Sequence, residues 1–124
     1  MREMEITKLL EFREREELRR WLAANHCQEK ECWVATYRRK EKPEGVCLRY
    51  LDVVEEALCF GWIDSTCKSM GDGRLAQRLS PRQKRSHWTA LNRERCAELE
   101  RRGLMTDAGR KAWEEGLENK NQER

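Results

Sequence analysis

Cationic side chains gather in one stretch of the chain, between residues 74 and 93. This stretch has no acidic residue, although the flanking sequence is rich in glutamate. Its basic residues are Arg74, Arg78, Arg82, Lys84, Arg85 and Arg93, with His87 among them. A guanidinium group presents a planar fork of N–H donors that suits the oxygens of carboxylates and phosphates. The stretch therefore predicts an anion site. The alternative is a solvated basic face whose arginines pair with glutamates of neighbouring helices.

The same stretch leads into a predicted helix. Ser86 is a favoured residue type at a helix N-cap, and Gly103 is a favoured residue just after a helix end. A helix that begins at Ser86 would direct free backbone N–H groups towards an anion. Trp88 would then form an apolar wall. Asn92, on the same helix face, would either line a pocket beside Trp88 or hold the preceding loop, and local hydrogen bonding favours the second role.

A β-hairpin is expected to bring further polar residues to this loop. Asp64 and Ser65 lie on its first strand, and Arg78 lies on the second. Asp64 is expected to form a structural ion pair with an arginine rather than to act in catalysis. Which side chains share a face depends on the register, which the sequence does not define. The full set of predicted anion- or ligand-binding residues is Asp64, Ser65, Arg78, Arg82, Lys84, Arg85, Ser86, Trp88, Asn92 and Arg93.

Other kinds of chemistry have weaker support in the sequence. The region of His26, Cys27 and Cys32 lacks the ligand spacing of a zinc site, so no metal is predicted. Cys59 lies between apolar residues without a neighbouring base, and core packing explains it better than catalysis. No glycine-rich phosphate loop or dinucleotide motif occurs, and no cofactor is predicted.

Composition favours one folded domain. The chain has 124 residues, of which 40% are charged and 38% hydrophobic, and its formal net charge is +3. Such a small net charge does not by itself indicate nucleic-acid binding. No apolar run approaches the ~20 residues that span a bilayer, and no signal-peptide pattern is visible, so we expect a cytoplasmic protein without membrane insertion. The six cysteines are then expected to be reduced.

Hydrophobic periodicity predicts an α+β fold, with about four helices around a small, mainly antiparallel sheet. The helices are expected over about residues 13–24, 50–60 and 86–102, with a short last helix that Thr106 caps and that carries Leu117. Strands are expected over residues 32–37, 62–69 and 74–80. We expect a single domain over residues 1–117 and a disordered tail over residues 118–124, which has no apolar anchor.

Two blocks of the sequence resemble the YdeI/OmpD-associated (bacteriocin-protection) family. They are Tyr50–Ser65 (YLDVVEEALCFGWIDS) and Leu79–Arg93 (LSPRQKRSHWTALNR). The second block continues to Leu99 and then to Gly103–Gly109 (GLMTDAG), while Trp21-Leu22 and Asn25-His26 fit the family's opening helix. The similarity covers roughly residues 10–115 in the family's order. Many members continue with a further basic helical segment, whereas this sequence ends soon after Leu117.

The resemblance implies a small cytoplasmic protein linked to tolerance of bacteriocins or other antimicrobial peptides, without an established catalytic mechanism. Together with the basic stretch, it predicts a stress-protection protein that binds an anionic small molecule or a protein partner. Two alternatives stay open. One is an enzyme that acts on a small anionic metabolite, which would need a perturbed acid or base beside Arg82. The other is a nucleic-acid-binding module, which would need an open basic stripe with exposed aromatic residues.

Overall fold

The computed structural model describes the backbone of residues 5–6, 8–83 and 87–122, with side chains described as far as residue 117. These residues form four helices and one five-stranded mixed sheet, an α+β fold as the sequence predicted. The helices are α1 (Arg15–Asn25), α2 (Tyr50–Cys59), α3 (Ala90–Arg101) and α4 (Asp107–Gln122). The strands are β1 (Leu9–Leu10), β2 (Cys32–Tyr37), β3 (Leu48–Arg49), β4 (Trp62–Gly71) and β5 (Arg74–Pro81).

Strand β2 is the centre of the sheet, and all six of its residues are buried. Along one edge it pairs in parallel with β1 at Trp33 and Val34 and with β3 at Thr36 and Tyr37. Along its other edge it pairs antiparallel with β5, and β5 pairs antiparallel with β4. A strand buried on both faces is expected to be continuously apolar, and the sequence CWVATY has that character.

The β4–β5 hairpin turns at Gly71, Asp72 and Gly73, all of which have positive φ. Glycine adopts such values without steric penalty, and aspartate tolerates them better than most residues. The hairpin is therefore the one that the glycines predicted. Its register contains irregularities between Asp64 and Thr66 and between Ser69 and Gly71. The first of these shifts the alternation of side chains near Asp64, which the sequence alone could not reveal.

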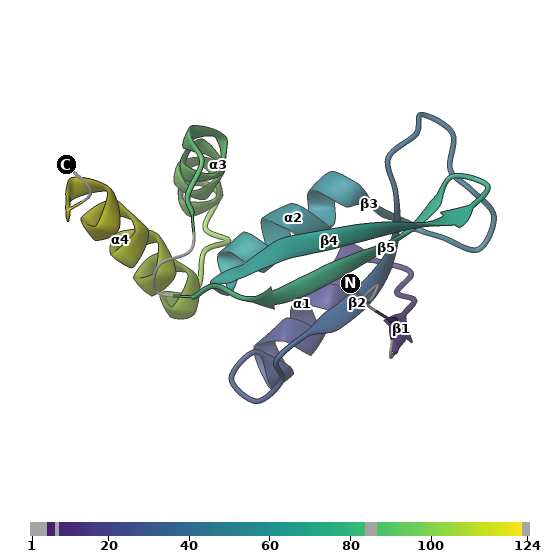
Figure 1. The fold of residues 1–124 in the computed structure, drawn as a ribbon, viewed down its shortest axis with the longest axis horizontal. Helices are drawn as coiled ribbons and strands as arrows, with labels where there is room; N and C mark the ends of the chain where they lie inside the picture. The colour runs from purple at the N-terminus through teal and green to yellow at the C-terminus, as the bar shows by residue number, and fades with distance from the viewer. Residues whose placement is uncertain (1–4, 7, 84–86, 123–124) are drawn as a thin grey trace.

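Helix α2 lies at the centre of the core. It packs on the sheet and contacts each of the other helices, and Figure 1 shows α3 and α4 at the end of the sheet where β4 begins and β5 ends. Leu58, Phe60 and Trp62, which flank the junction between α2 and β4, are buried as predicted. Gly61 allows this junction because its φ of 76° is unfavourable for other residues.

Two backbone contacts dock α4 against the end of α2. The carbonyl oxygen of Cys59 accepts a hydrogen bond of 3.1 Å from the backbone N–H of Thr106. A Cβ atom built on Gly109 would lie 2.3 Å from the same carbonyl oxygen. Glycine at this position thus permits a close approach between the two helices. The backbone of α4 is helical through Gln122, beyond the predicted end at Leu117.

The start of α3 differs from the prediction. Ser86 lies outside the described residues, but residues 87–89 are not helical and α3 begins at Ala90. Thr89 is the N-cap, and its hydroxyl oxygen accepts a hydrogen bond of 3.1 Å from the N–H of Asn92. The helix begins after Thr89 because the two residues before it make other contacts. The carbonyl of His87 accepts from Arg82, and the side chain of Trp88 is buried.

Candidate functional site

Arg78, one of the predicted site residues, is held by neighbouring side chains. Its Nη1 donates to Ser65 Oγ at 2.8 Å, and its Nη2 donates to Glu31 Oε2 at 2.9 Å. The structure therefore brings Arg78 and Ser65 together across the hairpin. The Glu31 carboxylate neutralises this guanidinium, and the contact links β5 to the residue that precedes β2.

Asp64 does not form the predicted ion pair with an arginine in the described part of the chain. Its Oδ2 instead accepts a hydrogen bond of 2.7 Å from the hydroxyl of Tyr50. Burial, followed by the hydrogen bond and charge of Asp64, raises the pKa of Tyr50 to about 12, against a smaller opposing effect of Arg38. Tyr50 is thus a protonated hydrogen-bond donor at neutral pH, and Asp64 serves to fix it.

Arg82 stacks on Trp88, with its guanidinium carbon 3.8 Å from the ring centre. Its Nη1 donates to the carbonyl of His87 at 3.2 Å, while its buried Nε and Nη2 have no hydrogen-bond partner among the described residues. Burial lowers the pKa of Arg82, and the nearby Cys96 and Asp64 oppose this effect only in part. The structure thus joins Arg82 and Trp88, as expected for a cation with an aromatic wall.

The remaining predicted site residues differ in their surroundings. Asn92 Oδ1 accepts a hydrogen bond of 2.9 Å from Arg95 Nη1, so the amide is satisfied within its own helix. Arg93 has a buried Nε without a partner among the described residues. Lys84, Arg85 and Ser86 lie outside the described residues. The described members of the predicted set thus have different surroundings: Arg78 and Asn92 have side-chain partners, whereas Arg82 and Arg93 have buried donors without a described partner.

A cavity of about 290 Å³ lies beside this region, and its lining is strongly cationic. We call it the arginine–tyrosine pocket. Its lining residues are Tyr37, Arg38, Arg49, Tyr50, Leu51 and Arg95. None of these six residues is acidic, and none of the three arginines forms a salt bridge with a described residue. By contrast, Arg15, Arg19 and Arg78 all contact carboxylates.

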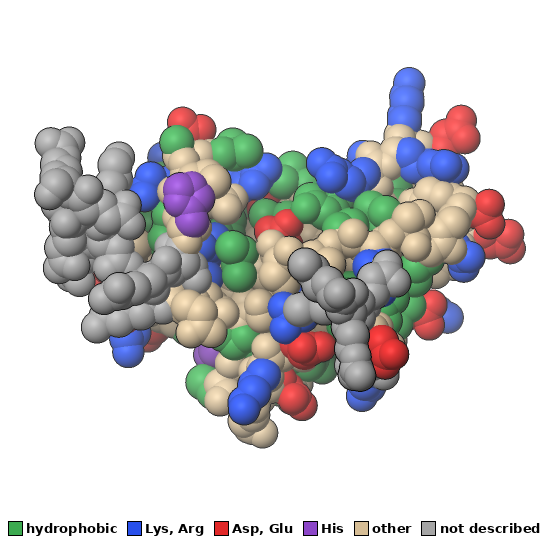
Figure 2. All heavy atoms as spheres, in the orientation of Figure 1, with side chains coloured by type: hydrophobic (Ala, Val, Ile, Leu, Met, Phe, Trp, Pro, Cys, Tyr) green, Lys and Arg blue, Asp and Glu red, His purple; other side chains and the backbone are tan. Residues whose placement is uncertain are grey.

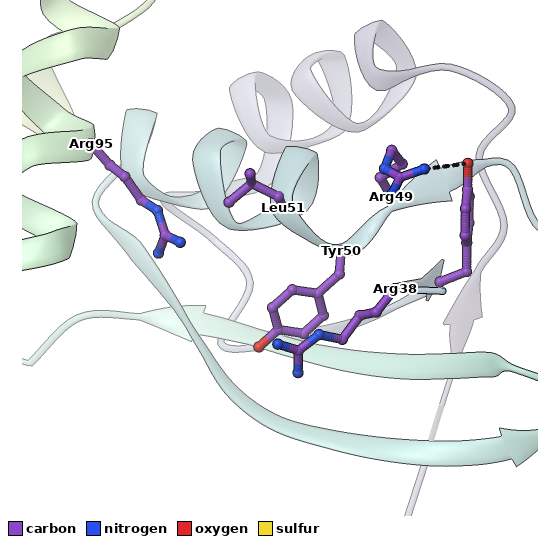
Figure 3. A pocket seen from close by; sticks show the side chains of 6 residues that line it. Arg38, Arg49, Tyr50, Leu51 and Arg95 are labelled. Atoms are coloured by element: carbon purple, nitrogen blue, oxygen red, sulfur yellow. Dashed lines mark hydrogen bonds between the residues drawn. The ribbon is translucent and has the colours of Figure 1, made fainter. Parts of the chain in front are cut away.

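Parallel pairing of two strands builds one side of the pocket. Tyr37, the last residue of β2, is the register partner of Arg49 in β3. Arg38 follows Tyr37 directly, and Tyr50 follows Arg49 as the first residue of α2. Two short segments that are distant in sequence thus place two arginines and two tyrosines together. Arg95 comes from α3 on the opposite side (Figure 3).

Each arginine of the pocket is held by a neutral partner. The guanidinium carbon of Arg38 lies 4.2 Å from the ring centre of Tyr50, and that of Arg49 lies 5.1 Å from the ring centre of Tyr37. Arg49 Nη1 also lies 3.4 Å from the Tyr37 hydroxyl, the contact dashed in Figure 3. Arg95 donates to Asn92. Cation–π contacts and hydrogen bonds to a neutral amide orient a guanidinium without cancelling its charge.

Hydrogen bonds connect this pocket to two predicted site residues. Tyr50 donates to Asp64, and Arg95 donates to Asn92. None of the six lining residues was among the predicted site residues. The run Arg38-Arg39-Lys40 and the pair Arg49-Tyr50 were visible signals. Their proximity depends on the pairing of β3, a strand of two residues that no periodicity could predict.

The charge on the visible face of the molecule in Figure 2 is mixed. On the face shown in Figure 2, basic and acidic side chains of the described residues are interspersed, without a continuous basic stripe. A second cavity of about 330 Å³ includes both Lys8 and the acidic Glu29 and Glu31 in its lining. The cationic lining of the arginine–tyrosine pocket therefore differs from the mixed lining of this second cavity.

Other site types find little support in the described part of the molecule. No group of three or more His, Cys, Asp or Glu side chains there is placed to hold a metal ion. All six cysteines are free thiols, and Cys32, Cys59 and Cys96 are buried. Burial raises the pKa of Cys32 and Cys96 to about 12, and that of Cys59 to about 11. These thiols are therefore poor nucleophiles. None of the described helices is long and apolar enough to cross a membrane.

Comparison with known proteins identifies a family over most of the chain. Residues 10–112 match the family model described as "Domain of unknown function (DUF8412)". The chain belongs to this family. The matched range of DUF8412 includes every residue of the arginine–tyrosine pocket. The chain matches no curated protein and no solved structure.

Proposed function

We propose that this DUF8412 chain is an anion-binding domain whose ligand occupies the arginine–tyrosine pocket. One observation carries the proposal: Arg38, Arg49 and Arg95 line a single cavity that has no acidic lining residue. Clustered like charges raise the free energy of the empty pocket, and a bound anion relieves this repulsion. Arginine also offers paired N–H donors, which match carboxylate and phosphate oxygens.

The size and chemistry of the pocket favour binding over catalysis. A volume of about 290 Å³ suits a small anionic molecule or one charged group of a larger partner. Its lining contains no histidine, carboxylate, cysteine or lysine that could exchange protons with a substrate near neutral pH. Tyr50 stays protonated because its pKa is raised to about 12. The lining residues can therefore hold and orient an anion, and they offer no general base.

The resemblance to the YdeI/OmpD-associated family supports a biological setting for this binding. The proposed role is protection against bacteriocins or other antimicrobial peptides, through an anionic ligand or partner of this domain. Six free thiols support a reducing compartment such as the cytoplasm. Arg82 and Arg93, which have buried donors without described partners, would extend the positive potential on the basic stretch next to the pocket.

Side-chain NMR tests the location of the site. Inorganic pyrophosphate is titrated into protein labelled with ¹⁵N in arginine, at constant ionic strength so that general screening does not change. The Nε–Hε resonances of Arg38, Arg49 and Arg95 should shift with one common binding curve. The resonance of Arg101, an exposed arginine paired with Glu98, serves as the internal control. Equal shifts of all four resonances would show only diffuse counter-ion binding and would refute the proposed site.

A further inference from the structure

One exposed leucine lines the arginine–tyrosine pocket, and a second lies one helical turn from the pocket residue Arg95. Among the described residues, the exposed large hydrophobic side chains are Leu51, Leu91 and Leu117, with relative exposures of 46%, 54% and 42%. Leu51 lines the pocket directly. Leu91 precedes the pocket residue Arg95 by four positions on α3, and residues at this spacing are neighbours on one helix face. Only Leu117, on α4, is not associated with the pocket lining in this way.

Figure 3 shows how these groups are arranged. Leu51 projects from the first turn of α2, with Arg95 on one side and Arg49 on the other, and the Tyr50 ring lies below it. In this view, Leu51 therefore lies between two cationic side chains. Arginine and tyrosine are enriched where proteins bind one another, and an apolar centre is typical of such surfaces.

We propose that the arginine–tyrosine pocket and Leu91 together form a docking surface for an acidic peptide segment of a partner protein. The carboxylates of that segment would bind Arg38, Arg49 and Arg95, and an aliphatic side chain of leucine size would pack against Leu51 and Leu91. This inference rests on the proposed function, since it requires that the pocket binds anions. It adds the class of the ligand and a second set of contact residues.

The contacts within the pocket favour a peptide over the other anionic ligands. Single-stranded nucleic acid binds through stacking of bases on exposed aromatic faces. Here the rings of Tyr37 and Tyr50 are each covered on one side by the guanidinium of Arg49 or Arg38. A small inorganic anion would make no use of the exposed leucines. An acidic segment with an aliphatic side chain satisfies both the charge and the apolar surface.

The surface is also held in place before it binds. Asp64 fixes Tyr50, Tyr37 orients Arg49, and Asn92 holds Arg95. Side chains that are ordered before binding lose less conformational entropy when the partner arrives. Electrostatic attraction would mainly increase the association rate and should fall with added salt. Burial of the leucines should mainly slow dissociation.

The test uses a fluorescein-labelled, end-capped octapeptide of alternating glutamate and leucine, with fluorescence anisotropy at fixed ionic strength. Two control peptides replace every glutamate with glutamine or every leucine with serine. Both controls should bind more weakly than the parent peptide. The matched protein variants are Leu91→Gln and Leu51→Gln at the surface, and Leu117→Gln as an equally exposed leucine elsewhere.

Leu91→Gln and Leu51→Gln should each weaken peptide binding by about five- to tenfold, the loss expected when a leucine no longer buries its side chain. Pyrophosphate binding, followed by calorimetry on Leu91→Gln, should not change, because Leu91 is not among the lining residues of the pocket. Leu117→Gln should leave both affinities unaltered. If the peptide binds equally well to all three variants, or if a ten-nucleotide oligothymidylate binds more tightly than the peptide, the docking surface is refuted. If pyrophosphate also fails to bind the wild type, the proposed function itself is wrong.

Discussion

The hydroxyl of Tyr50 donates a hydrogen bond of 2.7 Å to Asp64 Oδ2, and this contact joins the lining of the arginine–tyrosine pocket to strand β4. Tyr50 is the first residue of α2, and Asp64 lies near the irregular register of the hairpin. The bond therefore fixes the start of a helix to a point where the sheet departs from regular pairing. It also orients the aromatic ring on which Arg38 rests.

Tyr50→Phe should lower the free energy of unfolding by about 1–2 kcal/mol, because it removes the donor and leaves the half-buried Asp64 without this partner. The effect should depend on pH. The pKa of Tyr50 is about 12 in the folded protein, compared with 10 for an unperturbed tyrosine. Between these values the folded state holds the proton that the unfolded state has released, so this contribution to stability is complete below pH 10 and decreases as the pH rises towards 12.

Urea denaturation of wild type and Tyr50→Phe from pH 8 to pH 11.5 measures this contribution. The difference in unfolding free energy between the two proteins should become smaller above about pH 10. Other groups that titrate in this range, including the buried thiols, are common to both proteins and cancel in the difference. A difference that stays constant across the series would contradict the role assigned to the Tyr50 proton.

Glu56→Gln should destabilise the protein by about 3 kcal/mol, because it removes the buried carboxylate that two partly buried arginines share. Glu56 is almost completely buried and bridges Arg15 and Arg19 of α1, with 3.0 Å between Arg19 Nη1 and Oε1. Glu98→Gln is the control, since the pair of Glu98 and Arg101 is exposed and should contribute less than about 1 kcal/mol. Chemical denaturation gives both values. Equal losses would show that the Glu56 bridge contributes no more to stability than an exposed ion pair.

Gly109→Ala should be destabilising, although glycine-to-alanine changes within a helix usually stabilise it by about 0.5–1 kcal/mol. A Cβ atom at this position would lie 2.3 Å from the Cys59 carbonyl oxygen, so α4 would have to move away from α2. We expect a loss of about 1–3 kcal/mol in thermal or urea unfolding. A gain in stability would mean that the two helices do not approach each other so closely.

Thiol reactivity should divide the six cysteines into two groups. Cys27, Cys47 and Cys67 are exposed, whereas Cys32, Cys59 and Cys96 are buried with raised pKa values. In freshly prepared native protein at pH 7.5, a disulfide reagent should modify the exposed group first and the buried group only after unfolding. The total in denaturant should be six. A total below six would reveal a disulfide and contradict the expected reduced state.

Much of the fold followed from local patterns in the sequence. The periodic apolar residues of Tyr50–Cys59 and the β-branched and aromatic residues of Cys32–Tyr37 define α2 and β2 as predicted. The glycines at positions 71 and 73 define the hairpin turn. The start of α3 was predicted incorrectly because Ser86 and Thr89 are both good N-caps. Burial of Trp88 and the bond from Arg82 to His87 favour Thr89, and these are tertiary effects.

The candidate site was less predictable than the fold. Two of the predicted site residues, Asp64 and Asn92, contact the pocket residues Tyr50 and Arg95. Glu31 is distant from Arg78 in the sequence, and its carboxylate pairs with Arg78 only in the folded chain. A count of basic residues therefore cannot tell this paired arginine from one without a carboxylate partner. The pocket itself depends on β3, whose two residues pair in parallel with the end of β2. Such a short, non-local pairing leaves no periodic signal.

The most direct test of anion binding at the arginine–tyrosine pocket compares Arg95→Gln with Arg101→Gln, two identical changes on the same helix. Melting temperatures are measured while pyrophosphate is titrated at constant ionic strength, because a ligand that binds the native state stabilises it. Sucrose, which is excluded from the protein surface and carries no charge, provides the control for general exclusion effects. Wild type and Arg101→Gln should show the same saturable rise in melting temperature, and Arg95→Gln should lose most of it. An equal rise in all three proteins would contradict the assignment of the anion site to this pocket.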